Sequence, residues 1–125
     1  MNEYFLLITT DNHIKTCCSE HPDLYFYYHQ LGCRSIEIVR PFTGKTTKNQ
    51  IFVIDEEGAL KPNRINVVAS CFYGMPIYGN VLLAKEDFRN GEPDICGFNW
   101  DDFQFTKLAF RDCLETAGFT VTDCD

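Results

Sequence analysis

The apolar residues of this chain gather in short runs of strand length, separated by turn residues. Strands are expected over residues 3–9, 13–17, 34–40, 51–54 and 81–84, with residue 77 as an alternative start of the fifth and a short last strand over residues 119–122. Asp11 and Asn12 form a turn signal between the first two runs. Residues 36–40 and 51–55 are expected to pair as another antiparallel hairpin. The pattern predicts a mostly antiparallel sheet.

Two further segments repeat their apolar residues at helical spacing. Leu24, Tyr27, Tyr28 and Leu31 form the first stripe, which Gly32 ends. The second helix begins at the cap residue Asn99 and ends at Gly118. Its expected buried stripe comprises Phe103, Thr106, Phe110, Cys113, Leu114 and Ala117.

Residues 67–73 fit either a short helix or a strand, and the cap residue Asn66 with the stop residue Gly74 favours a helix. The expected fold is therefore α+β: a single domain over residues 1–125, with a mostly antiparallel sheet packed against two or three helices.

Length and composition indicate the cellular compartment in which this protein is expected. A chain of 125 residues has the size of one domain. No apolar run approaches the ~20 residues of a membrane span, and the start lacks the basic region of a signal peptide. A cytoplasmic protein with no membrane partner is expected. The seven cysteines are then thiols, most of them small apolar core residues.

The net charge of −7 is confined to one part of the chain. Residues 1–85 hold eight acids and eight bases, whereas residues 86–125 hold ten acids and three bases. Such a segment repels phosphate, so no direct binding to nucleic acid is expected. It would steer a basic partner toward the protein, or it would only keep the surface soluble.

No cofactor or metal site is expected. Gly44, Lys45 and Thr46 match the end of the phosphate-binding loop motif, but Val39 occupies the position where that motif requires glycine. Arg40, Lys45 and Lys48 could still contact an anion at a basic hairpin tip. His13, Cys17, Cys18 and His21 resemble a zinc cluster, yet adjacent cysteines on a strand point to opposite faces.

Enzyme signatures are also weak. A cysteine nucleophile at Cys33 or Cys71 would need one of three histidines, all confined to residues 13–29. Residues 55–58 (D-E-E-G) could supply a carboxylate pair or a cation site, although a solvated turn is the favoured interpretation. A non-catalytic protein is favoured, with an enzyme left open.

Several short motifs between residues 31 and 87 occur together in one order. They are I-E-I-V at 36–39, I-F-V-I-D-E-E-G at 51–58, Leu60-x-Pro62-Asn63, Tyr73-Gly74 and Gly79-Asn80. In this order they resemble a small family of phage and mobile-element proteins known only as a domain of unknown function. The resemblance implies a phage or mobile-element context and no chemistry.

These observations favour an accessory protein that engages a basic host protein, such as a defence or nucleic-acid-binding factor, through an acidic C-terminal surface. The expected partner-binding residues are Glu92, Asp94, Asp101, Asp102, Asp112 and Glu115. The alternative is a small-ligand-binding protein or small enzyme with a pocket around residues 63–80, formed by Asn63, Tyr73, Tyr78 and Asn80. The oligomeric state is left open.

Overall fold

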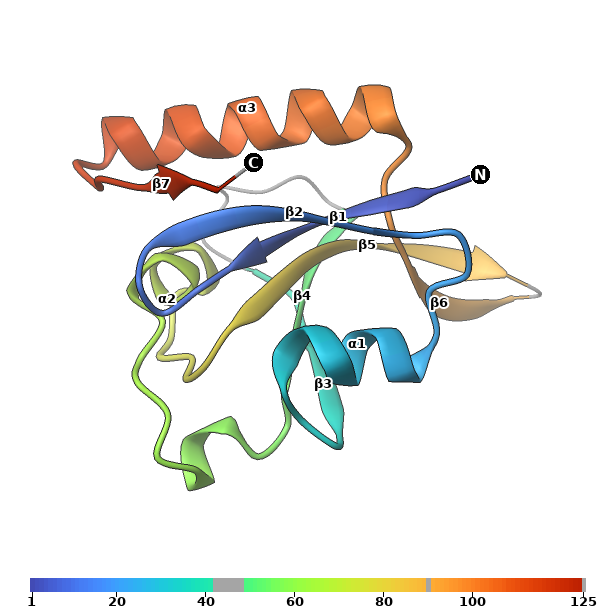
Figure 1. Ribbon diagram of the computed structural model, residues 1–125, viewed down its shortest axis with the longest axis horizontal. Coiled ribbons are helices and arrows are strands. Elements are labelled where there is room, and N and C mark those ends of the chain that lie inside the picture. The colour runs from blue at the N-terminus through green and yellow to red at the C-terminus, as the bar shows by residue number, and fades with distance from the viewer. Residues whose placement is uncertain (42–48, 90, 125) are drawn as a thin grey trace.

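Two hairpins and one long strand build the central sheet. The computed structural model describes residues 1–41, 49–89 and 91–124 (Figure 1). β1 (Glu3–Ile8) pairs with β2 (His13–Ser19), and β3 (Ile36–Val39) pairs with β4 (Gln50–Asp55). β5 (Val81–Arg89) lies between β4 and β1 and is antiparallel to both. Both expected hairpins are confirmed.

Two further strands extend this sheet. β6 (Glu92–Cys96) pairs with the second half of β5, and the short β7 (Thr122–Asp123) runs parallel to β2. The strand order is β3-β4-β5-β1-β2-β7, with β6 beside β5. After β6 the chain reaches β1, where the backbone of Phe98 exchanges hydrogen bonds of 2.9 and 2.8 Å with that of Tyr4.

The three central strands are buried on both faces. Successive side chains of a strand alternate between faces, so the runs F-L-L-I, I-F-V-I and V-L-L-A feed two separate cores. One core contains Leu6, Phe52 and Leu83, and the other contains Phe5, Val53 and Leu82. Continuous apolar runs in an antiparallel sheet therefore mean that helices cover both of its faces.

Three helices provide that cover. α1 (Leu24–Leu31) packs on one face through Tyr27 and Leu31. α2 (Val67–Tyr73) and α3 (Trp100–Thr116) pack on the other, where the rings of Phe72 and Phe110 stack 4.4 Å apart. Figure 1 shows α3 and α1 on opposite sides of the sheet. A 3₁₀ turn, η1 (Gly58–Leu60), follows β4.

Each α-helix begins after a residue whose side chain caps its N-terminus. Asp23, Asn66 and Asn99 accept backbone hydrogen bonds at the N-termini of α1, α2 and α3. Gly32 and Gly74 end α1 and α2 with positive φ angles of 63° and 102°. The α+β class and the helical state of residues 67–73 are confirmed.

Three details of the sequence prediction are wrong. β6 was not expected, because its acidic, proline-containing sequence lacks an apolar alternation. β5 extends well beyond residue 84, since β6 gives its polar second half a pairing partner. Ala117, expected in the buried stripe of α3, is exposed because the helix ends beside it.

No helix in the described part of the chain is long and apolar enough to cross a membrane.

Candidate functional site

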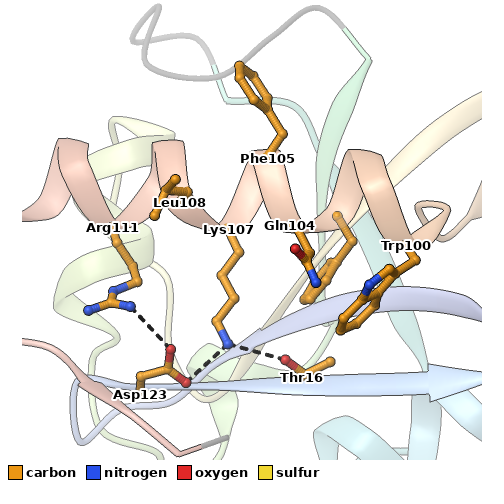
Figure 2. A pocket seen from close by; sticks show the side chains of 9 residues that line it. Thr16, Trp100, Gln104, Phe105, Lys107, Leu108, Arg111 and Asp123 are labelled. Carbon is orange, nitrogen blue, oxygen red and sulfur yellow. Dashed lines mark hydrogen bonds and ion pairs between the residues drawn. The ribbon is translucent and has the colours of Figure 1, made fainter.

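Three stripes of side chains along α3 form the candidate site and its support. The buried stripe consists of Phe103, Thr106, Phe110 and Leu114. Residues at i, i+4, i+7, i+11 and i+14 share one side of a helix, and these spacings place Asp101, Phe105, Leu108, Asp112 and Glu115 on the outer stripe. Trp100, Gln104, Lys107 and Arg111 form the groove stripe, which faces β2 (Figure 2).

The outer stripe combines carboxylates with large exposed apolar side chains. Phe105 is 77% exposed and Leu108 is 59% exposed, and both lie between Asp101 and the pair Asp112 and Glu115. All three acids are exposed. None of them forms an ion pair with a basic residue in the described part of the chain. This side of the helix is therefore acidic and apolar together.

The two basic residues of α3 lie on the groove stripe instead. Lys107 Nζ donates to Asp123 Oδ1 (3.1 Å) and Thr16 Oγ1 (3.4 Å), and Arg111 Nη1 lies 3.5 Å from Asp123 Oδ2 (Figure 2). These contacts join α3 to β7 and β2. They also direct both cations away from the outer stripe.

The remaining predicted acids lie elsewhere. Asp102 is in the first turn of α3, where its backbone N–H donates to Asn99 Oδ1 (2.8 Å) and its carboxylate accepts from Asn99 Nδ2 (3.0 Å). Glu92 and Asp94 are exposed on β6, and Asp94 stands opposite Asp87 of β5. The structure thus brings Asp101, Asp112 and Glu115 onto one helix face and leaves the β6 acids on a separate hairpin.

The alternative pocket is only partly formed by its predicted residues. Asn63 and Asn80 line a polar pocket of about 330 Å³ beside the C-terminal end of α1. Asn80 Oδ1 accepts from the backbone of Thr10 (3.2 Å), and Asn63 Nδ2 donates to the carbonyl of Gly58 (3.2 Å). Tyr73 packs against the core and Tyr78 pairs with Ile65, and neither lines this pocket.

Asp55 overturns the solvated-turn interpretation of residues 55–58. It is buried, accepts from the backbone of Glu57 (2.9 Å) and forms an ion pair of 2.7 Å with Lys61. This hydrogen bond raises the pKa of Lys61 above its ordinary value. Only Glu56 and Glu57 are exposed, so the turn has one structural carboxylate and two surface carboxylates.

Cysteine chemistry is not set up at Cys33. Burial, and then the nearby negative charge of Asp55, raises the pKa of this thiol, so the reactive thiolate is disfavoured. Cys17, Cys33 and Cys96 are buried and Cys113 packs against the core, so four of the seven cysteines are core residues as expected. Cys18, Cys71 and Cys124 are exposed.

The zinc candidates lie on or beside β2. Cys17 is buried and Cys18 exposed, as opposite faces of a strand require. Among the described residues, no three His, Cys, Asp or Glu side chains gather closely enough to hold a metal ion. The residues of the candidate phosphate loop, 44–46, together with Lys48, lie outside the described residues.

Comparisons with known proteins add a fold neighbour and no family. No protein-family model and no curated protein matches the sequence. The crystal structure of the small RNA methyltransferase HEN1 is similar over 82% of this chain, with a TM-score of 0.60 and 15% identity. This chain corresponds to 15% of that methyltransferase chain. At such identity the likeness shows a shared fold alone.

Sequence reasoning missed the groove stripe. Trp100 lies outside the buried stripe that the sequence predicts. Lys107 and Arg111 were considered only as basic residues within the acidic segment 86–125. Their spacing of i, i+7 and i+11 was a readable signal. The sequence did not reveal the strand that faces this stripe, because β7 is too short for its position in the sheet to be predicted.

Proposed function

We propose that this protein is a non-catalytic accessory binding protein of a phage or mobile element, and that the outer stripe of α3 engages a basic host protein. The observation that carries the proposal is the placement of exposed Phe105 and Leu108 between unpaired carboxylates on one helix face. The phage context rests on the sequence resemblance alone.

The apolar part of the stripe supports a protein partner. Single exposed apolar residues are ordinary, but a phenylalanine and a leucine at i and i+3 form one contiguous contact area on the helix. Aromatic side chains are enriched at the centres of interfaces, where they supply most of the binding energy. Phe105 would be the anchor in such a contact.

The acidic part of the stripe supports a basic partner. Asp101 and Asp112 are eleven residues apart, which is roughly 16 Å along a helix. Carboxylates at both ends of the apolar area would pair with cations around an apolar patch and would raise the association rate. A second copy of α3 would instead meet like charges, so self-association through this face is disfavoured.

The other predicted acids have a different role in this proposal. Asp102, Glu92 and Asp94 contribute to the field that steers the partner, and the outer stripe makes the contact. Replacing Glu92 and Asp94 by Gln and Asn should therefore slow association more than it changes dissociation.

Site-specific photocrosslinking in host cells tests the proposal directly. A photoreactive phenylalanine analogue at position 105 should capture a basic protein. The matched control is the same analogue at Tyr25, which is 81% exposed on α1 across the sheet.

The captured partner, once purified, allows a charge-matched comparison. The triple variant Asp101→Asn, Asp112→Asn, Glu115→Gln should weaken binding at least about tenfold, which is a loss of roughly 1.4 kcal/mol in binding free energy. Glu20→Gln, Glu56→Gln, Glu57→Gln makes the same change in net charge at exposed sites elsewhere and should have little effect. Equal losses in both triples, or tight DNA binding by the wild-type protein, would refute the proposal.

A small-ligand function is the second candidate. Asn63 and Asn80 converge on the same polar pocket, which supports it. Native mass spectrometry of protein purified from its host distinguishes the two functions, because a bound metabolite favours the pocket and a bound protein favours α3.

A further inference from the structure

We propose that the groove between α3 and β2 is a second binding site, which takes a small organic anion that carries a planar ring. The groove is lined by the groove stripe of α3, by Thr16 of β2 and by Asp123 of β7 (Figure 2). Phe105 and Leu108 of the outer stripe also contribute to the lining. The outer-stripe acids Asp101, Asp112 and Glu115 do not line the groove, and the inference does not depend on the function proposed above.

The groove has the size and composition of a ligand site. Its volume is about 540 Å³, within the range of roughly 300–1,000 Å³ that small-molecule pockets occupy. The partly exposed indole of Trp100 supplies apolar surface, and Gln104 and Thr16 supply hydrogen-bonding groups. Such a mixture orients a ligand that has one flat apolar part and one polar part.

Trp100 provides the surface for the ring. Its indole packs against Tyr4 with ring centroids 4.8 Å apart, which fixes its orientation. The side chain is nevertheless 47% exposed beside the groove. A partly exposed indole held by a neighbouring ring is preorganised for stacking, so a planar ligand would lose little side-chain entropy on binding.

Arg111 provides the charge at the other end. The side chain is 43% exposed, and its contact with Asp123 is long at 3.5 Å. A guanidinium has five N–H donors, so this contact leaves donors that a carboxylate or phosphate can accept from. The described lining holds two cations and one carboxylate, in a chain whose net charge is −7. The groove is thus a locally positive site on an acidic protein.

The order of residues along the groove stripe sets the ligand's orientation. Trp100, Gln104, Lys107 and Arg111 follow one another at i, i+4, i+7 and i+11, from aromatic through amide to cation. A ring stacked on Trp100 would direct its acidic group toward Lys107 and Arg111.

The chain's single tryptophan makes the test specific, because it lies in the groove. The Trp100 indole N–H resonance is followed by NMR during titration with two charged and uncharged pairs: adenosine monophosphate with adenosine, and flavin mononucleotide with riboflavin. The charged member of at least one pair should shift the resonance saturably, and its uncharged match should bind at least about tenfold more weakly.

Variants assign the binding to the groove. Arg111→Gln should weaken binding of the shifting anion by about tenfold, and Gln104→Ala should weaken it by less. Arg34→Gln removes an exposed arginine elsewhere and should change nothing. The melting temperature of each variant shows whether the fold is kept, and Gln104→Ala serves if Arg111→Gln unfolds.

Three outcomes would overturn the inference: no shift with either anion, equal affinity of charged and uncharged probes, or equal effects of Arg111→Gln and Arg34→Gln. Substitution of the outer-stripe acids Asp101, Asp112 and Glu115 should not weaken anion binding, because none of them lines the groove. This test and that of the proposed host partner can therefore fail separately.

Discussion

The side-chain amide nitrogen of Asn66 donates to the carbonyl oxygen of Ile8 at 3.0 Å, across 58 residues of sequence. The same nitrogen donates to the carbonyl of Gly79 (3.0 Å), and Asn66 Oδ1 accepts from the backbone of Ala69 (3.0 Å). Asn66 is fully buried. One side chain thus caps α2 and ties it to the end of β1 and the approach to β5.

Replacing Asn66 should therefore destabilise the fold. Asn66→Ala removes the helix cap and leaves two carbonyls short of a donor, at a cost of about 2–4 kcal/mol in the free energy of unfolding. Asn66→Asp keeps the cap acceptor but loses both donations and places a buried carboxyl group against two carbonyl oxygens, so it should also destabilise the fold. Urea denaturation measures both, and a loss below ~1 kcal/mol for each variant would contradict this role.

The stripes of α3 predict opposite effects at two nearby residues. Phe110 is buried against Phe72, so Phe110→Ala should cost ~3–5 kcal/mol in unfolding free energy. Asp112 is exposed on the outer stripe, so Asp112→Ala should change stability by about 0.5 kcal/mol at most. Thermal unfolding of the two variants checks the comparison, and a larger loss at Asp112 would mean that the stripes are misplaced.

Stability should fall in alkaline solution. A group whose pKa is raised by folding contributes stability below its unfolded pKa and loses that contribution as pH rises through the folded value. Both Cys33 and Lys61 have raised pKa values, from burial and from the Asp55 hydrogen bond respectively.

The loss should begin above pH ~8.5, where unfolded thiols ionise, and continue above ~10.4, where lysines do. Cys33→Ala should remove the first part and Lys61→Met the second, measured as unfolding free energy against pH. A wild-type curve that stays flat up to pH ~11 would contradict both assignments.

The cysteines should separate into reactive classes. Cys18, Cys71 and Cys124 are exposed and should react with a thiol reagent in the native protein. Cys33 should be among the slowest, because it is both buried and disfavoured as a thiolate. Alkylation followed by peptide mass spectrometry resolves each site, and fast labelling of Cys33 would show that its surroundings are open.

Gly97 should not tolerate a side chain. A Cβ placed there would lie 2.7 Å from Glu3 Cβ and 2.9 Å from the ring of Phe5. Gly97→Ala should therefore cost about 1–3 kcal/mol by forcing the chain away from β1. Gly118→Asn is the comparison, since Gly118 has open space around it and asparagine is among the residues least strained by its positive φ of 89°. Equal unfolding free energies for the two variants would refute the close approach.

Local signals in the sequence were enough for most of the fold. Asn99 and Gly32 mark helix ends through their own backbone chemistry, and the helical spacing of Phe103 and Phe110 needs no partner to be recognised. β6 and the burial of Asp55 could not be predicted in this way. Each depends on a distant partner: β5 supplies the backbone ladder of β6, and Lys61 supplies the counter-charge of Asp55.

The candidate site shows the same limit. The composition of residues 86–125 indicated an acidic surface, but it could not distinguish Asp112 on the outer stripe from Asp123, which accepts from Lys107. That difference depends on where β7 lies, because its pairing with β2 places Asp123 beside the groove stripe of α3. A strand of two residues gives no sequence signal for that position.

The position of β5 between β4 and β1 has a consequence for the growing chain on the ribosome. Both hairpins are complete in sequence by Asp55, yet β1 and β4 keep open edges until residues 81–85 of β5 have been synthesised. During that interval β1 and β4 present unpaired backbone beside side chains that are apolar on both faces, a surface prone to aggregation. The nascent protein should therefore need a chaperone, or rapid translation, most urgently between these two points of its synthesis.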